Sequence, residues 1–415
     1  MSDLARIMQR IESYRDDMVR LQIELTAIPA LSPDNGGTGE YDKAQFLRRT
    51  LDKMGFANIR SCDAPDPRVP SGIRPNILCS IPGKTPQCAW IMTHIDIVPP
   101  GERSFWSADP YTGYETDGKV YGRGTEDNQQ DLVASLFAAK AFLDEGISPG
   151  LTIRLAFVAD EETGSEYGMI YLLEHENQLF QESDLYLIPD FGSQDGAKIE
   201  IAEKSMLWVR FKTIGKQCHA SRPEAGRNAF RAASFLITEL DKLKVIFDLR
   251  NPHFDPPEST FEPTRKDPNV PNINTIPGED VFYLDCRVLP EYPLKDVLAA
   301  MRKKSDDIER AFGVRIEISI VQESQAPPAT KETAEIVVRL QNAIKTVYGV
   351  QGVPVGIGGG TVAACLRKNN LPAAVWCRIG ETAHQPDEHC LIDNMIGNAK
   401  VYGFLFWGAE SEKME

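Results

Sequence analysis

Residues 89–101 read AWIMTHIDIVPPG, an apolar run that leads into His94 and Asp96 and closes on two prolines and a glycine. A short apolar run bounded by turn residues is typical of a strand that is buried in a parallel sheet. Ligands of open α/β sheets bind at the carboxyl ends of the strands. The segment therefore predicts an α/β fold, and it places a histidine and an aspartate at the edge of the sheet where a site forms.

Strands and helices alternate on both sides of this segment. Strands are predicted at residues 76–82, 89–98, 151–159 and 185–189. Apolar residues at helical spacing predict helices at residues 3–26, 43–54, 128–145 and 164–176. This alternation is typical of a sheet that has parallel members and is flanked by helices.

From about residue 205 the pattern becomes self-contained. Its predicted elements are strands at 206–214, 281–289 and 314–321, helices at 224–243 and 294–312, and a segment rich in Pro and Asn at 245–278. Two β-α-β halves predict an inserted α+β domain of the ferredoxin-like kind. A helix at 331–348, a strand at 372–377 and a helix at 391–407 then return to α/β character. The 415 residues thus divide into one domain of 1–204 with 323–415 and a second of 205–322.

The composition excludes several classes of protein. Asp and Glu total 60 against 45 Lys and Arg, which gives a net charge of −15 and argues against a nucleic-acid partner. No run approaches the roughly 20 apolar residues that span a bilayer, and the charged start is not an apolar signal segment. The eight cysteines are scattered without a C-x-x-C pair, as is typical of a reducing compartment. We expect a cytoplasmic protein with no membrane or nucleic-acid partner.

Acidic and imidazole side chains follow several of the predicted strands or precede a helix. They are His94, Asp96, Asp127, Glu161, Glu162, Asp190 and His384. Two imidazoles and three carboxylates are the ligands that two borderline divalent ions need, with one carboxylate shared. Asp96 has the spacing of a partner that fixes the His94 imidazole. Of the adjacent pair Glu161 and Glu162, one carboxylate can bind metal and the other can transfer protons.

Motifs of other enzyme classes are incomplete. Leu78 stands where a P-loop requires its first glycine, and Leu179 stands where an H-E-x-x-H motif requires its second histidine. No G-x-S-x-G elbow of a serine hydrolase occurs. His175, His253 and His389 are expected to be structural.

The motifs fall in a fixed order along the chain. They are His94-x-Asp96, Gly122-Arg123-Gly124-x-x-Asp127, Glu161-Glu162, Asp190, His219-Ala220-Ser221 and His384. Together they resemble the M20 family of co-catalytic zinc hydrolases, which includes succinyl-diaminopimelate desuccinylases, acetylornithine deacetylases, carboxypeptidase G-type enzymes and dipeptidases. The resemblance extends over nearly the whole chain. It implies a zinc-peptidase-like catalytic domain with a mixed sheet flanked by helices, interrupted by a ferredoxin-like dimerisation or lid domain.

The resemblance also implies a metal centre. One zinc ion would be held by His94, Asp127 and Asp190, and the other by Glu162, His384 and the shared Asp127; cobalt and manganese suit the same ligands. Glu161 would act as general base toward a water that bridges the two ions, and then as acid. His219 would reach across from the partner subunit in a homodimer to stabilise the oxyanion. The peptide bond between Asp127 and Asn128 would be cis.

The same resemblance assigns substrate-binding groups. They are Asn274, Arg287 and the loop residues Gly359, Gly360 and Thr361. Arg287 has the side chain that can clamp a carboxylate bidentately, and backbone N–H groups of a Gly-rich loop can meet an anion.

Two departures bear on the substrate. Many relatives carry a Met-Lys-Gly-like run after the shared aspartate, where this chain has Asn128-Gln129-Gln130. Succinyl-substrate enzymes usually place an arginine where this chain has Cys365. The missing arginine weakens an assignment to succinyl-diaminopimelate in particular.

The sequence predicts a metal-dependent hydrolase that cleaves an amide bond of a small N-acyl amino acid or a short peptide. Dipeptidase or aminopeptidase activity within the same family is an open alternative. From another class, a non-catalytic metal-dependent binding protein is disfavoured because the base Glu161 is present. The substrate, the choice between exopeptidase and deacylase, the native metal, the state of the lid and the need for a dimer stay open.

Overall fold

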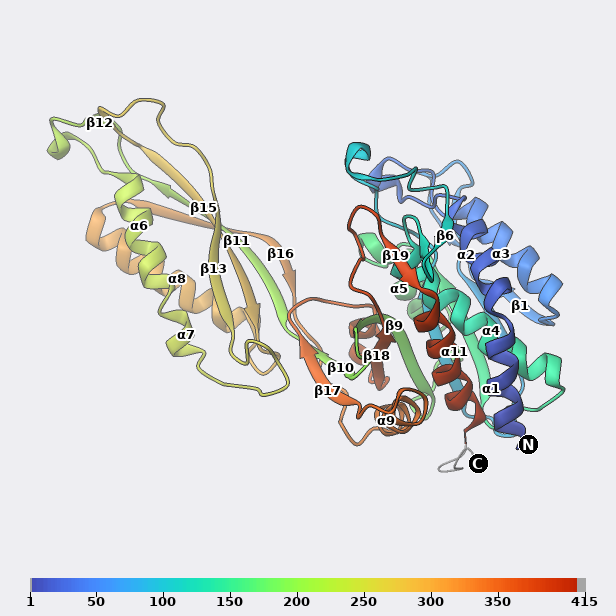
Figure 1. Ribbon diagram of the computed structural model, residues 1–415. Helices are drawn as coiled ribbons and strands as arrows, with labels where there is room; N and C mark the ends of the chain where they lie inside the picture. The colour runs from blue at the N-terminus through green and yellow to red at the C-terminus, as the bar shows by residue number, and fades with distance from the viewer. Residues whose placement is uncertain (1, 409–415) are drawn as a thin grey trace. The chain divides into compact units, whose positions relative to one another are not determined.

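The computed structural model describes residues 2–408, which form two compact units (Figure 1). The first unit contains the chain up to Ile201, Thr330–Pro354 and the chain from Cys365 onward. The second unit contains Ala202–Ala329 and Val355–Ala364. The Gly-rich loop thus belongs to the second unit, whereas the sequence-based boundaries place it in the first domain. Hydrogen bonds to Glu203 and Arg287 of the second unit account for this difference.

The first unit is built on an eight-stranded mixed sheet with the order β1-β4-β8-β5-β9-β18-β10-β17. Its strands are β1 (Asn58–Ser61), β4 (Ile77–Ile81), β8 (Thr152–Val158), β5 (Cys88–His94), β9 (Leu185–Ser193), β18 (Ala373–Arg378), β10 (Lys198–Glu203) and β17 (Val353–Ile357). The neighbours β8, β5, β9 and β18 are parallel, whereas β1, β4 and β10 pair antiparallel. The carboxyl ends of the four parallel strands therefore lie at one edge of the sheet.

Helices cover this sheet. α4 (Gln130–Glu145) and α11 (Ile392–Trp407) pack against each other and against β5, and α1 (Asp3–Ser13) contacts both helices. All residues of β5 are buried, which explains its continuously apolar sequence. The remaining helices outside the inserted segment are α2 (Arg15–Thr26), α3 (Tyr41–Met54), α5 (Met169–His175), α9 (Glu335–Tyr348) and α10 (Ala363–Lys368). Within residues 2–408 no helix combines the length and apolarity that a membrane crossing needs.

The predicted single helix at residues 3–26 is wrong, because the chain turns at Tyr14 between α1 and α2. The Tyr14 ring packs against Phe137 of α4 with 5.0 Å between the ring centroids. Its hydroxyl donates a hydrogen bond of 2.6 Å to Asp144. These long-range contacts hold the turn, and the local helical periodicity does not reveal them.

The second unit is a two-layer α+β structure. Its elements are β11 (Ser205–Ile214), α6 (Ala229–Leu240), α7 (Leu243–Ile246), β13 (Thr260–Lys266), β15 (Glu279–Val288), α8 (Leu294–Phe312) and β16 (Arg315–Ser324). The four strands form an antiparallel sheet with the order β13-β15-β11-β16, which gives the predicted ferredoxin-like arrangement. Residues of β11 and β15 alternate between buried and less buried, because α6 and α8 cover one face.

The strand β13 is missing from the sequence-based prediction, which gives residues 245–278 only as rich in Pro and Asn. Pro263 lies within this strand and reads as a strand breaker. It is tolerated because β13 is an edge strand and its register shifts next to Pro263.

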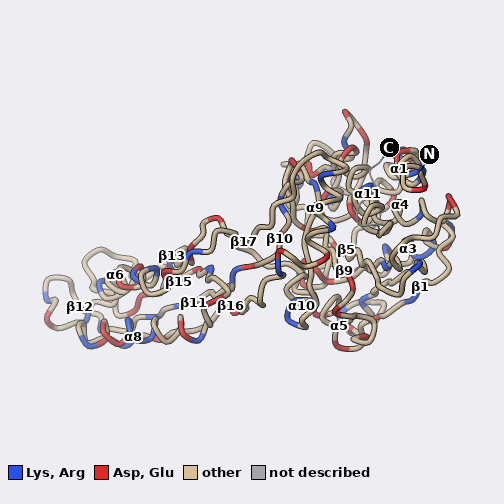
Figure 2. Tube along the Cα trace, turned by 90° about the horizontal axis from the view of Figure 1, so that it is seen from below, with Lys and Arg blue, Asp and Glu red and all other residues tan. Residues whose placement is uncertain are grey.

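Short strands complete the structure. They are β2 (Ala64–Pro65), β3 (Ile73–Arg74), β6 (Tyr114–Thr116), β7 (Lys119–Tyr121), β12 (Cys218–His219), β14 (Thr275–Ile276) and β19 (His389–Leu391). Figure 2 shows Lys and Arg interspersed with Asp and Glu along the traces of both units. Charges of both signs therefore occur throughout the chain.

Candidate metal centre

The parallel strands of the first unit carry the candidate ligands. His94 is the last residue of β5, Glu161 and Glu162 follow β8, and His384 lies in the loop between β18 and β19. Because these strands are neighbours and run the same way, their carboxyl ends bring the side chains to one edge of the sheet. Asp127 joins them from the turn Thr125–Gln129 at the start of α4.

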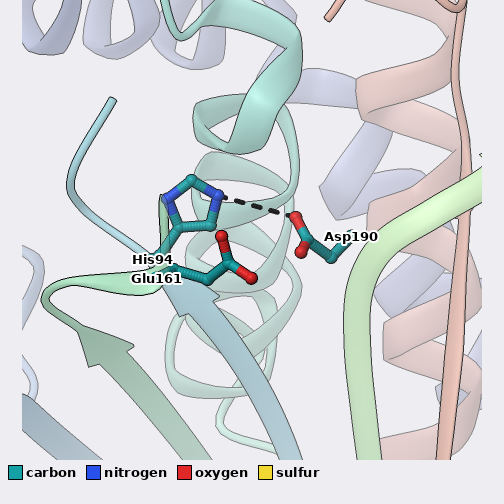
Figure 3. Close-up of side chains that lie close together, drawn as sticks. All are labelled: His94, Glu161 and Asp190. Carbon is teal, nitrogen blue, oxygen red and sulfur yellow. Dashed lines mark ion pairs between the residues drawn. The ribbon is translucent and has the colours of Figure 1, made fainter. Parts of the chain in front are cut away.

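The strand β9 bulges where it carries Asp190. Its register with β18 pairs Ile188 with Val375, but Gly192 with Cys377. Three residues of β9 therefore lie opposite one residue of β18, which disrupts the ladder around Asp190. The Asp190 carboxylate faces the imidazole at the end of β5 (Figure 3).

The first cluster of contacts surrounds His94. Its Nε2 atom lies 2.9 Å from Asp127 Oδ1 and 3.5 Å from Asp190 Oδ1. Figure 3 shows the Glu161 carboxylate beside the same imidazole. Ligand atoms of His94, Glu161 and Asp190 all lie within 4.8 Å of one another, as do those of His94, Asp127 and Glu162.

The second cluster surrounds His384. Its Nε2 atom lies 3.0 Å from Asp127 Oδ2 and 3.2 Å from Glu162 Oε2. One oxygen of Asp127 thus faces His94 and the other faces His384. The carboxylate of Asp127 is shared between two imidazoles, each of which also contacts a second carboxylate.

Asp96 holds the groups around the first imidazole. The Nδ1 atom of His94 lies 3.0 Å from the Asp96 carbonyl oxygen and 3.4 Å from its Oδ1 atom. The backbone N–H groups of Glu161 and Glu162 each donate a hydrogen bond of 3.1 Å to the Asp96 carboxylate. Asp96 therefore orients the His94 ring and fixes the acidic turn after β8 at the same time.

The acidic surroundings favour the cationic form of both imidazoles. Burial lowers the pKa of His94, but hydrogen bonds to Asp127 and Asp190 outweigh burial and hold this pKa well above its usual value. Hydrogen bonds to Asp127 and Glu162 raise the pKa of His384 to about 10. The carboxylates thus create a position that stabilises positive charge, which is the position that a metal cation takes.

The pKa values of two carboxyl groups in the cluster shift in opposite directions. Burial raises the pKa of Asp127, but hydrogen bonds with His384 and His94 outweigh burial and hold this pKa below the usual range. Burial raises the pKa of Glu161 well above its usual value, and the nearby Asp190 adds to the shift. Asp127 is therefore suited to remain a charged ligand, whereas Glu161 is suited to hold a proton.

The residues present fit a divalent metal centre. Imidazole nitrogens and carboxylate oxygens converge from five segments, and the two Nε2 atoms approach opposite oxygens of one carboxylate. This mixture of nitrogen and oxygen donors suits zinc, cobalt or manganese.

Comparison with known proteins places the chain in a family. The profile of peptidase family M20/M25/M40 matches residues 90–406. The chain belongs to this family. A protein from Methanococcus maripaludis described as an uncharacterized metallohydrolase is 40% identical over 411 residues, with 94% of this chain and 99% of the relative covered. A succinyl-diaminopimelate desuccinylase from Methylobacterium radiotolerans is 28% identical over 396 residues, with 94% and 95% covered.

Solved structures of low sequence identity share the fold of this M20 chain. The aminopeptidase PepT from Bacillus cereus superposes with a TM-score of 0.74 at 16% identity, with 95% of this chain and 98% of that chain covered. Human carnosine dipeptidase 1 superposes with a TM-score of 0.71 at 16% identity, with 98% of both chains covered. The predicted family and fold class are therefore confirmed: the chain is a metallohydrolase of the M20 type.

Residues that sequence reasoning missed hold the loop of Asp127. The carboxylate of Glu388 is fully buried and accepts hydrogen bonds of 3.0 Å from the backbone N–H groups of Gly124, Glu126 and Asp127. It also pairs with Arg123. Burial raises the pKa of Glu388 to about 7. The only sequence signal was the nearness of Arg123 and Glu388 to the predicted ligands.

The peptide bond between Asp127 and Asn128 is cis, which confirms the prediction from the family resemblance. The side-chain amide of Asn128 donates a hydrogen bond of 2.6 Å to the Pro189 carbonyl and one of 3.2 Å to Asp190 Oδ1. Asn128 thus connects the loop of the shared carboxylate to the bulge that carries Asp190.

In the second unit, His219 and Asn274 lie together. β12, which ends at His219, pairs with β14, and the N–H of Ala220 donates a hydrogen bond of 2.8 Å to the Asn274 carbonyl. His219 is exposed, and its Nδ1 atom lies 2.8 Å from the Ser221 hydroxyl. The predicted pair of groups is therefore on one exposed part of this unit.

The predicted anion-binding groups have partners within the chain. The Arg287 guanidinium donates two hydrogen bonds of 2.8 and 3.1 Å to Asp285 and one of 2.8 Å to the Gly358 carbonyl. The N–H and hydroxyl of Thr361 donate hydrogen bonds of 2.9 and 2.6 Å to Glu203 Oε1. Gly359 and Gly360 are exposed. An internal carboxylate thus lies where sequence reasoning placed a substrate anion.

Proposed function

We propose that this M20 protein is a dinuclear metal-dependent hydrolase that cleaves an amide bond of a small N-acyl amino acid or a short peptide. The observation that carries the proposal is the Asp127 carboxylate, whose two oxygens face the Nε2 atoms of two imidazoles at 2.9 and 3.0 Å. A carboxylate in this position can bind two ions at once.

These contacts support the proposed metal ligands. His94, Asp127 and Asp190 would hold one ion, and Glu162, His384 and Asp127 the other, with zinc as the expected metal and cobalt or manganese as substitutes. Two bound ions supply positive charge that acidifies a water molecule and polarises the amide carbonyl. Asp96 keeps the His94 ring in the orientation that this ligand role requires.

Glu161 acts as the general base. Its backbone is fixed by Asp96, and its carboxylate stands beside His94 and Asp190 at the edge of the sheet (Figure 3). From there it takes the proton of the attacking water and delivers it to the amide nitrogen as the C–N bond breaks. The high pKa of this carboxyl group suits a residue that alternates between base and acid.

The first unit is the catalytic unit in this proposal, and the second is a dimerisation lid. Support comes from apolar side chains that are solvent-exposed in the second unit, namely Ile320 and Val321 of the edge strand β16 and Phe235 of α6. A homodimer formed through this unit would let His219 of the partner subunit stabilise the oxyanion.

Asn274, Arg287 and the loop of Gly359, Gly360 and Thr361 are proposed to bind the substrate. Arg287 has the bidentate geometry that a carboxylate needs, since it already binds Asp285 in this manner. We also propose a cytoplasmic location, because the eight cysteines are scattered along the sequence without a C-x-x-C pair.

The proposal is tested with metal-loaded protein on a panel of N-acyl amino acids and dipeptides with free and blocked amines. Glu161→Gln should retain two metal ions and lose activity by about 10²–10⁴-fold. Glu166→Gln changes an exposed carboxylate five residues away and serves as the matched control. Full activity of Glu161→Gln would remove this residue from its role. Tight metal binding without cleavage of any amide would favour a binding protein instead.

A further inference from the structure

Each of the two loops that carry Asp127 and His384 supplies one buried carboxylate that accepts hydrogen bonds from backbone N–H groups of the other loop. Glu388, from the second loop, accepts the backbone N–H groups of the first. Glu126, from the first loop, accepts backbone N–H groups of the second. Each loop thus supplies the acidic side chain that holds the other, although the two are more than 250 residues apart in the sequence.

Glu126 is surrounded by the loop that leads to His384. Its carboxylate accepts hydrogen bonds from the N–H groups of Gly380, Thr382 and Ala383, the last at 2.9 Å, and from the Thr382 hydroxyl at 2.9 Å. Successive N–H groups that turn toward one anion form a nest. A Cβ atom at position 380 would lie 3.0 Å from Glu126 Oε1, so the glycine permits the close approach.

The two imidazoles of the metal centre are held by different means. The side chain of His94 is 2% exposed and stands at the end of a fully buried strand. The side chain of His384 is 53% exposed, and its backbone has a positive φ of 62°. Packing therefore positions His94, whereas the hydrogen-bonded loop positions His384, and the N–H directly before His384 is one that Glu126 holds.

We propose that Glu126 is a positioning residue for the metal subsite of Glu162 and His384. By holding residues 380–383 it sets the Nε2 atom of His384 against Asp127 and Glu162. Glu388 holds Asp127 itself, which both subsites share. Loss of Glu126 should therefore weaken one subsite, and loss of Glu388 should weaken both. The inference rests on the proposed dinuclear function.

Metal titration tests whether Glu126 supports only one of the two metal subsites. Wild-type chain should bind two Zn²⁺ ions in equilibrium dialysis, whereas Glu126→Ala should keep the first affinity and lose at least about tenfold in the second. Glu126→Gln, which preserves volume, should lose less. Asp184→Asn is the matched control, because Asp184 is also buried and accepts a backbone N–H, from Cys88 at the amino end of β5. The control should bind both ions as the wild type does.

Coupling to His384 provides a second criterion. If Glu126 acts through this imidazole, Glu126→Ala added to His384→Ala should cause no further loss of metal affinity. Additive losses, wild-type binding of two ions by Glu126→Ala, or equal weakening of both ions in that variant would each overturn the proposal.

Hydrogen–deuterium exchange of metal-free protein tests whether Glu126 holds this loop, independently of the proposed function. Glu126→Ala and Glu126→Gln should accelerate exchange at Gly380, Thr382 and Ala383, and leave the strand before His94 protected. Unchanged exchange in that loop would contradict the inference even if the enzyme proves dinuclear. A wild-type chain that binds fewer than two ions would contradict the proposed function, while faster exchange of this loop would still support its positioning by Glu126.

Discussion

Three candidate metal ligands of the first unit, His94, Glu162 and Asp190, lie at or near the carboxyl ends of parallel strands. The candidate substrate groups of the second unit lie on exposed turns and on a strand whose side chains already have partners. His94 is enclosed at the end of β5 and faces two carboxylates. His219 is exposed on the short strand β12, and Arg287 is paired with Asp285. In the first arrangement His94 contacts the carboxylates that would share a metal ion with it. In the second, Arg287 must exchange Asp285 for a substrate carboxylate.

The metal ligands and the substrate groups thus differ in how their positions are fixed. His94, at the end of a buried strand, has its position fixed by the sheet, so binding of metal requires little movement of this ligand. A site whose arginine and Gly-rich loop bind internal carboxylates can admit a substrate anion only by displacing them. We therefore expect substitutions in the first unit to alter metal binding and those in the second to alter substrate binding.

The largest effect is expected for Asp127→Ala. The change removes the carboxylate that both imidazoles share, so both ions should be lost and activity should fall to the level of metal-free protein. Metal content by mass spectrometry and amide hydrolysis measure the two losses. Asp285→Ala, a carboxylate change in the second unit, should keep both ions. Loss of metal in the Asp285 variant would break the division between the units.

His219→Ala should reduce kcat by about 10²–10³-fold, because an oxyanion partner is lost while the metal ligands stay in place. If the residue acts across a dimer, mixing this variant with Glu161→Gln restores activity. Random pairing makes half of the dimers mixed, and each has one complete site, so about a quarter of the sites should recover. The control is each variant alone. Absence of recovery after subunit exchange would contradict a role in trans.

Asp96→Asn should weaken metal binding by about 10–100-fold, the usual cost of losing the group that orients a metal-binding imidazole. The amide retains the shape of the carboxylate but offers only one acceptor oxygen to the N–H groups of Glu161 and Glu162. Zinc titration with a competing chelator measures the change. Wild-type affinity would show that packing of β5 alone fixes His94.

A smaller effect is expected at Arg287. Arg287→Lys loses bidentate contact, so KM for a substrate with a free carboxylate should rise by about tenfold, with kcat nearly unchanged. Asp285→Asn should have the opposite effect, because it removes the charge that now competes for the guanidinium. An amide-blocked substrate is the control and should respond to neither change. Equal responses of both substrates would exclude Arg287 from carboxylate binding.

The sequence predicts that His94, Glu161 and Asp190 lie close together, because each stands at the end of a predicted strand whose apolar run is visible. His94, Glu161 and Asp190 can be placed at one edge once the strands are known to be parallel. The pairing of Arg287 with Asp285 is also predictable from the sequence, since residues two apart lie on the same face of a strand.

Other features depend on contacts that local patterns do not contain. Glu126 and Glu388 act on loops that are distant in the sequence, so nothing near either residue indicates its partner. The turn at Tyr14 depends on α4, and the strand β13 tolerates Pro263 because of its place at the edge of the sheet. In each case tertiary structure overrides the local signal.

The smallest effect concerns pH and a buried carboxyl group behind the metal centre. Burial raises the pKa of Asp131 to about 7, although Tyr402, Gln130 and Asn398 donate hydrogen bonds to it. Between pH 4 and 7 the folded state therefore holds a proton that the unfolded chain has released. The free energy of unfolding should therefore fall as pH rises through this range.

Asp131→Asn removes the titrating group, so the unfolding free energy of metal-free protein should depend less steeply on pH between 4 and 7. Urea unfolding in the presence of a chelator measures it. Gln130→Ala removes one hydrogen-bond donor but keeps the carboxyl group, so its slope should match that of the wild type. An unchanged slope in Asp131→Asn would assign the pH dependence to other groups. Because Asp131 contacts α11 through Asn398 and Tyr402, a flatter slope would locate this acid–base sensitivity between α4 and α11, apart from the substrate groups of the second unit.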